Sequence, residues 1–233
     1  MIANNCNFLI TIDGPAGAGK STIAKNLGNN LGFNYLDSGA YYRCYALSAL
    51  QRDIEASDET ALRHMVLETS VVVEYPSGKA PVYTVNKRDV SLDIRTQRVS
   101  LCVSPISQSP TIRDAVNLTL RRMASSGKFI IDGRDIGTVV FPDANLKFFL
   151  TASSQVRAER RYKELLARGE EVSLSQLKSE IETRDKMDSE RAIAPLRRPE
   201  DAILVDSTSL SLNEVVAVMS EYVEKAHQRG LIR

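Results

Sequence analysis

The stretch ITIDGPAGAGKST, Ile10–Thr22, decides the fold of this chain. Within it, Gly14–Ser21 matches the pattern G-x-x-x-x-G-K-[ST] and stands between an apolar run and an amphipathic segment. A strand, a glycine-rich turn and a helix in this order are typical of a phosphate-binding loop, whose backbone N–H groups face an anion. The alternative is a glycine-rich turn with a solvated lysine, and the flanking pattern disfavours it.

The loop offers the groups that bind a nucleoside triphosphate. We expect Lys20 to bridge the β and γ phosphates, Ser21 to ligate Mg²⁺ and Thr22 to donate to the α-phosphate. The predicted nucleotide-binding residues are Gly14, Pro15, Ala16, Gly17, Ala18, Gly19, Lys20, Ser21 and Thr22. These residues predict a phosphoryl donor, but they do not indicate the acceptor.

Short apolar runs that predict buried strands recur along the chain, with helical segments between them. They cover residues 8–12, 33–36, 128–132, 146–150 and 202–206. This alternation predicts an α/β fold, in which a five-stranded parallel sheet is flanked by helices on both faces. One segment, about residues 68–95, is rich in β-branched residues around the turn-like PSGKAP and predicts a small antiparallel β insertion. We expect one domain over residues 1–233.

Composition excludes several classes of function. The formal net charge is only +1, so we expect no binding to nucleic-acid polymers. The three scattered cysteines, Cys6, Cys44 and Cys102, suit a reducing compartment rather than a disulfide framework. No apolar run is long enough to cross a membrane and the N-terminus lacks a secretory pattern, so we expect a cytoplasmic protein without membrane contact.

A nucleotide-hydrolysing switch is one alternative to a transferase. The segment NKRD, Asn86–Asp89, matches the N-K-x-D guanine-binding motif of GTPases, but it falls in the predicted β insertion rather than after a central strand. A switch also needs a D-x-x-G segment to sense the γ-phosphate, and no aspartate of this chain has glycine three residues later. The sequence therefore disfavours a switch.

A transferase needs a second polar cluster for its acceptor. Asp132 ends a predicted core strand, where a carboxylate typically holds metal-bound water, although it could instead cap a helix. Arg184, Asp188 and Arg191 are spaced i, i+4 and i+7, which predicts one face of a helix. A solvated helix face would show the same spacing, so this stripe alone does not establish an acceptor site.

Several segments in order along the chain resemble the bacterial cytidylate kinases, which are relatives of the nucleoside monophosphate kinases. The matching segments are ITIDGPAGAGKST, LDSGAYYR, IRTQRV, DGRDIGTVVFPDA and RDKMDSERAIAPL. The resemblance covers nearly the whole chain and implies the P-loop kinase fold, with a helical lid. It includes the β insertion, which is similar to an extra lobe of that family in its CMP-binding region.

The resemblance implies Mg²⁺-assisted transfer of the ATP γ-phosphoryl group to CMP or dCMP, without a dedicated catalytic base, by a monomer. It implies contacts to the CMP phosphate and its surroundings from Ser38, Arg43, Arg134 and Asp135. It likewise implies contacts to the cytosine edge from Ser104, Arg113 and Arg191, and to the ribose from Arg184 and Asp188. A P-loop kinase acting on another small acceptor, such as shikimate or a different nucleotide, is the remaining alternative.

The segment of about residues 153–171 is similar to the closing lid of the family. Within it, Arg157 and Arg161 are one helical turn apart, with Arg160 between them. The resemblance implies that lid arginines reach over the phosphates. The predicted catalytic residues are therefore Lys20, Arg134, Arg157 and Arg161, and the predicted metal ligands are Ser21 and Asp132.

Overall fold

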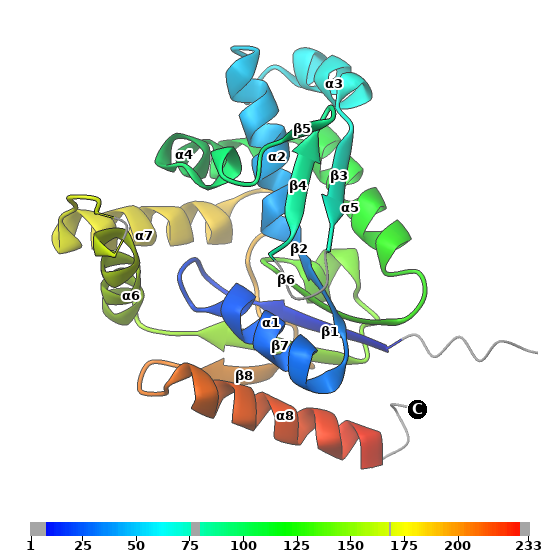
Figure 1. The fold of residues 1–233 in the computed structure, drawn as a ribbon, viewed down its shortest axis with the longest axis vertical. Helices are drawn as coiled ribbons and strands as arrows, with labels where there is room; N and C mark the ends of the chain where they lie inside the picture. The colour runs from blue at the N-terminus through cyan, green and yellow to red at the C-terminus, as the bar shows by residue number, and fades with distance from the viewer. Residues whose placement is uncertain (1–7, 76–79, 168, 229–233) are drawn as a thin grey trace, which may run out of the picture. The chain divides into compact units, whose positions relative to one another are not determined.

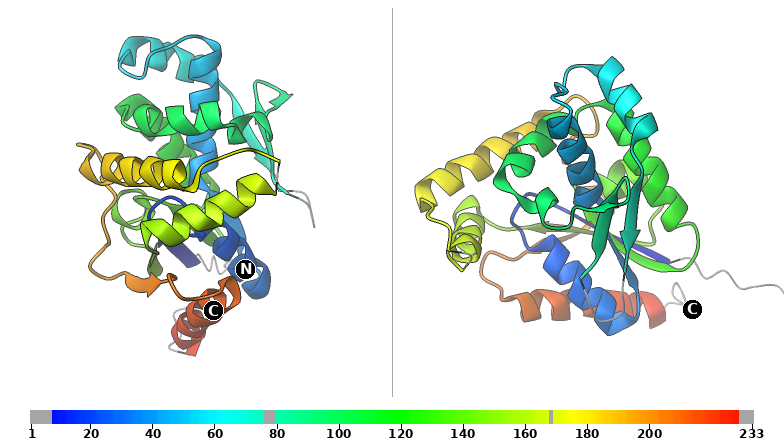
Figure 2. Two further views of the ribbon diagram at one scale, coloured as in Figure 1. Left: turned by 90° about the vertical axis from the view of Figure 1, so that its left-hand side faces the viewer. Right: turned by 45° about the horizontal axis from the view of Figure 1, so that its top comes forward.

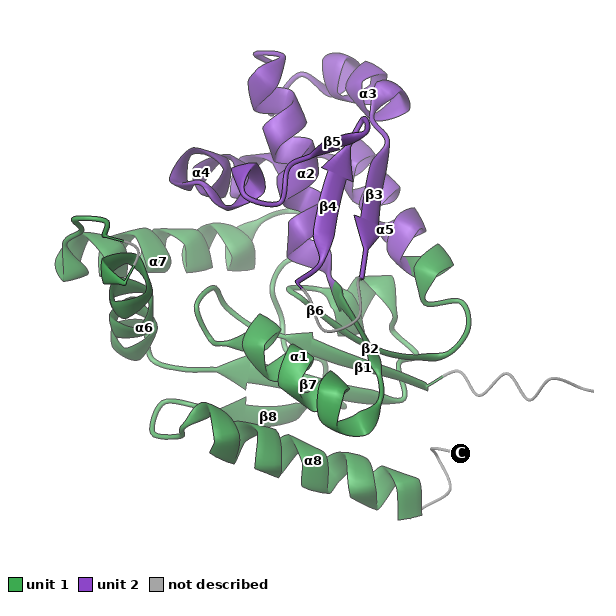
Figure 3. Ribbon diagram, viewed as in Figure 1, with its two compact units in different colours: residues 1–36, 121–233 green, residues 37–120 purple. Residues whose placement is uncertain are grey.

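The computed structural model describes residues 8–75, 80–167 and 169–228. The chain forms two compact units, unit 1 with residues 1–36 and 121–233 and unit 2 with residues 37–120 (Figure 3). Unit 1 contains β1 (Phe8–Asp13), α1 (Lys20–Leu31), β2 (Asn34–Asp37), β6 (Lys128–Gly133), η2 (Ile136–Val140), β7 (Leu146–Thr151), α6 (Ser154–Leu166), α7 (Leu174–Glu190), β8 (Ile203–Asp206) and α8 (Leu212–Gln228). Unit 2 contains α2 (Ser38–Gln51), α3 (Glu59–Glu68), β3 (Val71–Glu74), β4 (Val82–Val85), β5 (Arg88–Asp89), η1 (Asp93–Arg95), α4 (Gln97–Ile106) and α5 (Pro110–Met123).

Unit 1 is built on a five-stranded sheet in the order β2-β6-β1-β7-β8. Strand β1 lies at its centre and pairs in parallel with β6 on one side and β7 on the other. Each strand that the sequence predicts is present, with ends within one residue of the expected ones. The predicted α/β fold with a five-stranded sheet is confirmed, and β1 delivers the phosphate loop to the middle of its carboxyl edge.

One buried apolar cluster of unit 1 lies on a single face of this sheet. Side chains alternate between faces along a strand, and Phe8, Ile10 and Ile12 of β1 all pack into one buried apolar cluster with α1 and α8. Figures 1 and 2 show these two helices together against the sheet. Burial of each large apolar side chain contributes about 1.5–3 kcal/mol, so the cluster holds the loop between β1 and α1 on a rigid base. Odd-numbered residues of β1, including Asp13, point to the opposite face.

Unit 2 contains the predicted β insertion. Strands β3, β4 and β5 form an antiparallel sheet, which confirms the expected arrangement. Asn86 and Lys87 join β4 to β5 with positive φ angles of 47° and 69°, the geometry of a tight hairpin turn. The N-K-x-D segment is therefore a hairpin turn, as its context predicts.

Helix α7 ends one residue earlier than the i, i+4, i+7 pattern requires. Its last residue is Glu190, and Arg191 has extended backbone angles of φ −60° and ψ 142°. The expectation that Arg184, Asp188 and Arg191 share one helical face is therefore wrong for Arg191. The predicted insertion also includes residues 76–79 and the predicted lid includes residue 168, which lie outside the described residues.

Candidate active site

The predicted phosphate loop runs from the end of β1 to the start of α1. A side chain at Gly14 would overlap the carbonyl oxygen of Leu150, so only glycine fits there. Gly19 has a φ of 92°, in the left-handed region that favours glycine, and it precedes α1 without a capping side chain. The N–H groups of the first turn of α1 are thus left to bind a ligand, as a phosphate loop requires.

Lys20 is folded into this loop. Its side chain is buried, and Nζ donates to the carbonyl oxygen of Pro15 at 2.8 Å. Burial, followed by the positive charge of Arg134, lowers the pKa of Lys20 to about 7, while Asp132 works in the opposite direction. Arg134 and Arg184 oppose the charge of this ammonium group, and Asp132 and Asp13 favour it. A bound polyanion would shift that balance toward the charged form, which is the electrostatic character of a phosphate site.

Asp132 lies at the end of β6, where the sequence predicts a metal ligand. Its Oδ2 accepts from the Ser21 hydroxyl at 2.9 Å, and its Oδ1 accepts from the Tyr35 hydroxyl at 2.7 Å. Ser21 and Asp132, the two predicted ligands, are therefore neighbours. Tyr35 of β2 has a role that the sequence analysis missed, because its partner is 97 residues away in the chain.

The donor set fits Mg²⁺. A hydroxyl and a carboxylate are hard oxygen ligands, and Mg²⁺ is commonly bound by one or two protein groups together with substrate phosphates and water. Within residues 8–75, 80–167 and 169–228, no group of three His, Cys, Asp or Glu side chains is arranged to hold a metal ion. One hydroxyl and one carboxylate would leave the other coordination positions of Mg²⁺ to phosphate and water oxygens.

Two ion pairs join the segment after β6 to the end of α7. Arg134 Nε donates to Asp188 Oδ2 at 2.8 Å, and Arg191 Nη2 donates to Asp135 Oδ1 at 3.1 Å. Burial raises the pKa of Asp188, but Arg134 and Arg184 outweigh that effect and hold it below its ordinary value. Five predicted acceptor residues of unit 1 are thus brought together, although they come from two distant parts of the chain.

The remaining predicted acceptor residues belong to unit 2. Ser38 is buried at the first position of α2, and Arg43 of the same helix donates to Ser100 Oγ at 2.8 Å. Ser104 is buried in α4. Arg113 is buried in α5, where it donates to Ser107 O at 3.2 Å and its guanidinium lies 5.8 Å from the ring centre of Tyr42. These four side chains are buried or hydrogen-bonded within unit 2, so they do not form a solvent-exposed polar face.

The arginines of α6 have different surroundings. Arg157 is buried and donates to Ala16 O of the phosphate loop at 2.9 Å and to Asp185 at 2.6 Å. Arg160 also reaches the loop, through Ala18 O at 3.4 Å. By contrast, Arg161 pairs with Glu164 at the surface at 3.2 Å. Positions i, i+3 and i+4 share one broad helix face, so helical spacing alone did not show that Arg160 rather than Arg161 contacts the loop.

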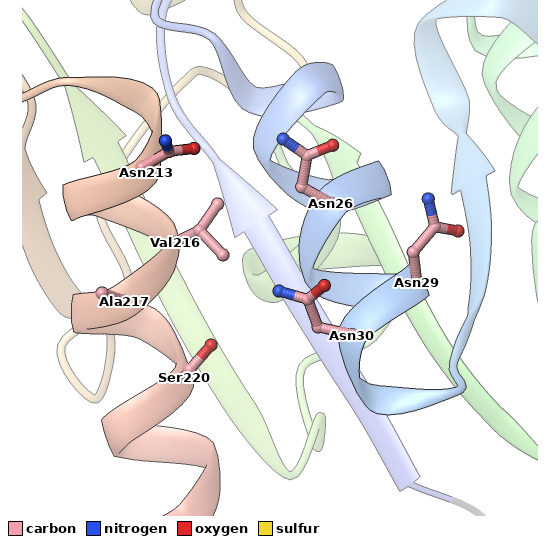
Figure 4. A pocket seen from close by; sticks show the side chains of 7 residues that line it. All are labelled: Asn26, Asn29, Asn30, Asn213, Val216, Ala217 and Ser220. Carbon is pink, nitrogen blue, oxygen red and sulfur yellow. The ribbon is translucent and has the colours of Figure 1, made fainter.

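A separate groove of about 400 Å³ lies between α1 and α8 (Figure 4). Amide side chains dominate its lining, with Asn26, Asn29 and Asn30 on α1 and Asn213 on α8. It contains none of the predicted site residues. In the described part of the chain, no helix is long and apolar enough to cross a membrane.

Comparison with known proteins gives a consistent result. A family model described as cytidylate kinase matches residues 10–225. The cytidylate kinase of Carboxydothermus hydrogenoformans is 44% identical over 214 residues, which cover 92% of this chain and 96% of the relative. That of Pediococcus pentosaceus is 44% identical over 225 residues, covering 97% and 99%. A gluconokinase from Sinorhizobium meliloti has a TM-score of 0.50 at 13% identity, covering 97% and 99%, a likeness that shows the fold alone.

Proposed function

Because the chain belongs to the cytidylate kinase family and is a kinase, we propose that it transfers the γ-phosphoryl group of ATP to CMP or dCMP. The products are ADP and CDP or dCDP. The proposal depends on one contact: Arg157 donates both to Ala16 O of the phosphate loop at 2.9 Å and to Asp185 of α7 at 2.6 Å, so the helix that carries the predicted acceptor residues is held against the loop. Donor and acceptor groups then act in one electrostatic field, which transfer between two phosphates needs.

On the donor side, the backbone of the loop and Lys20 bind the triphosphate. Ser21 and Asp132, which lie 2.9 Å apart, would hold Mg²⁺. The metal, when bound, neutralises phosphate charge and orients the phosphate oxygens. Lys20 would exchange its hydrogen bond with Pro15 O for phosphate oxygens, and the added negative charge would keep it protonated.

The reaction needs little proton chemistry. The phosphate of CMP is already mostly ionised near neutral pH, so an oxygen of it attacks the γ-phosphorus directly while the bond to the β-γ bridging oxygen breaks. What the protein must supply is in-line positioning and cancellation of repulsion between two polyanions. Lys20 and the arginines do this, and no dedicated base is required.

On the acceptor side, the proposal assigns residues by the chemistry they offer. Ser38, Arg43, Arg134 and Asp135 act at and around the CMP phosphate, and Arg184 and Asp188 act at the ribose. Ser104, Arg113 and Arg191 act at the cytosine edge. Guanidinium groups donate, and cytosine presents N3 and O2 as acceptors where uracil presents an N3 donor. A mismatched buried polar pair costs about 1–3 kcal/mol, so CMP is preferred over UMP.

The segment of about residues 153–171 is proposed to close over the phosphates when both substrates are bound. Arg157 supports this role, since it already touches the loop through Ala16 O. Closure would exchange its bond with Asp185 for phosphate contacts, and Arg161 would leave its surface pair with Glu164. Exclusion of water in the closed state would suppress hydrolysis of ATP.

The proposal extends to the setting of the enzyme. The whole chain acts as one kinase domain, with the insertion of about residues 68–95 in its CMP-binding region. Cys44 and Cys102 are free thiols, which supports a reducing, cytoplasmic location.

We also propose that the enzyme is a monomer. Light scattering on a sizing column should then give a mass near 25.8 kDa, and a doubled mass would contradict the monomer.

Release of ADP tests the proposed reaction. ATP and Mg²⁺ are supplied with CMP, dCMP, UMP, AMP or shikimate, and a reaction without acceptor measures hydrolysis. We expect the highest kcat/KM with CMP or dCMP and little ADP without acceptor. Faster turnover of AMP or shikimate would overturn the cytidine assignment, and release independent of acceptor would overturn the transferase.

A further inference from the structure

Asp13, the last residue of β1, links two parts of unit 1 that are far apart in the sequence. Its Oδ1 accepts from the backbone N–H of Ile136 at 2.9 Å, and its Oδ2 accepts from that of Gly137 at 2.7 Å. These residues open η2, 123 and 124 positions further along the chain. Both carboxylate oxygens are thus used to hold one backbone turn.

Burial is unfavourable for the charged form of the Asp13 carboxylate. Asp13 is 1% exposed, and burial raises its pKa to about 6 despite the hydrogen bonds from Gly137 and Ile136, which lower it. The negative charge of Asp135 raises it as well, and Lys20 lowers it. An apolar or amide side chain would avoid the cost of burying a charge. A carboxylate nevertheless offers a separate acceptor oxygen to each of two neighbouring N–H groups, which an amide or a hydroxyl does not.

The turn that Asp13 holds carries two of the proposed acceptor residues. Arg134 and Asp135 directly precede η2, and they form the ion pairs with Asp188 and Arg191. Gly137 fits tightly against β1, because an added Cβ would lie 2.8 Å from Thr11 Oγ1 and 3.3 Å from Asp13 Oδ2. Hydrogen bonds and close packing therefore fix the position of this turn relative to β1.

We propose that Asp13 is a positioning residue for the acceptor: by holding the N–H groups of Ile136 and Gly137, it sets Arg134 and Asp135 against the phosphate loop. Gly14, the first residue of that loop, follows Asp13 directly in the chain. One residue thereby ties the donor side to the acceptor side. This inference rests on the proposed function, since it takes Arg134 and Asp135 as CMP-binding groups.

If Asp13 has a purely structural role, its loss would lower the amount of folded enzyme or weaken the binding of both substrates equally. A positioning role acts on one substrate, because the glycine-built loop keeps its own backbone form while the turn shifts. The distinguishing quantity is the KM for CMP compared with the KM for ATP, measured on folded enzyme.

The main test uses Asp13→Asn, which keeps the size of the side chain. An asparagine amide has one acceptor oxygen where the carboxylate has two. Its NH₂ group would therefore replace an oxygen that now accepts from a backbone N–H within 3 Å, and that hydrogen bond would be lost. We expect the KM for CMP to rise about tenfold and the KM for ATP to change less than about twofold. Circular dichroism confirms the fold before the kinetics are interpreted.

Two further variants keep the test decisive. Gly137→Ala leaves the carboxylate intact but pushes the turn away from β1, so it should also raise the KM for CMP selectively. Asn145→Ala is the matched control, because its side chain accepts from the Leu9 N–H at 2.8 Å at the other end of β1. It should leave the ratio of the two KM values unchanged.

The outcomes separate this inference from the proposed function. Wild-type enzyme that does not phosphorylate CMP overturns the proposed function itself. Active wild-type enzyme with an unchanged KM for CMP in Asp13→Asn, or with both KM values raised equally, overturns the positioning role. If Asp13→Asn does not fold, Gly137→Ala decides, and an unchanged KM for CMP there overturns the inference.

Discussion

The phosphate loop and the proposed acceptor cluster of unit 1 are built in opposite ways. The loop, Gly14–Thr22, is continuous in sequence and presents its backbone, with one buried lysine. The acceptor cluster uses side chains from the segment after β6 and from the end of α7, held by the pairs Arg134–Asp188 and Asp135–Arg191. A backbone cradle accepts any triphosphate, whereas paired side chains depend on distant partners. We therefore expect the choice of acceptor to depend on the second region.

Loss of Lys20 should have the largest effect, because Lys20 is the only charged side chain of the loop that can contact the reacting phosphates. Lys20→Ala should lower kcat/KM at least about 10³-fold for both substrates. Folding should survive, since the pKa lowered to about 7 shows that burial of this cation is costly. Steady-state kinetics and a melting curve check this, with Lys225→Ala on the exposed side of α8 as control. An active Lys20→Ala enzyme would contradict the role of the loop.

Loss of Asp188 should impair binding of the acceptor while leaving binding of ATP nearly unchanged. Asp188→Ala leaves Arg134 without its buried partner, and losing such a charge partner costs about 2–5 kcal/mol. We expect the KM for CMP to rise about 100-fold, with little change in the KM for ATP. Asp143→Asn, in an exposed turn, is the control. Equal changes in both KM values would mean that the stripe is not specific to the acceptor.

The free energy of unfolding should depend on pH through Asp13, the residue that links the phosphate loop to the turn that follows Arg134 and Asp135. The pKa of Asp13 is raised from 3.8 to about 6, so the folded state binds a proton that the unfolded state releases between these values. Stability from this group is therefore present at low pH and is lost as pH rises through about 6. Relative to Asp13→Asn, wild type should lose about 2 kcal/mol of unfolding free energy between pH 4.5 and 7.5. Urea unfolding measures the difference, and a difference independent of pH contradicts the buried-carboxylate account.

Loss of the Ser104 hydroxyl should have the smallest effect of the four. Ser104 is buried in α4, and one neutral hydrogen bond contributes about 1 kcal/mol. Ser104→Ala should reduce the preference for CMP over UMP about fivefold to tenfold while leaving the KM for ATP unchanged. Competition between the two nucleotides measures this ratio, with the exposed Ser125→Ala as control. A constant ratio would remove Ser104 from base selection.

The fold could be predicted from the sequence because its signals are local. Each apolar run ends within one residue of an observed strand end, and Gly14–Ser21 carries the loop in consecutive residues. The end of α7 could not be predicted from periodicity. Spacing continues through Arg191, but the chain turns at Ala194, whose φ is 49°, and Arg191 donates to Ala194 O at 2.6 Å.

The site was predictable only where a motif names its residues. Ser21 and Asp132 are neighbours as expected, but Tyr35 and Asp13 were missed, since their partners are 97 and 123 residues away. For Asp13 a signal exists: a charged residue ends an otherwise apolar central strand. In α6, Arg157 and Arg160 contact the phosphate loop and Arg161 pairs at the surface, a choice fixed by how the helix rotates against that loop.

The fate of the γ-phosphoryl group tests the central claim most directly. ATP labelled in the γ-phosphate is incubated with enzyme and Mg²⁺, with and without CMP, and the products are separated. If the chain phosphorylates CMP, the label moves to the β-phosphate of CDP and little inorganic phosphate forms without CMP. Label released as inorganic phosphate at the same rate with and without CMP would contradict the central claim.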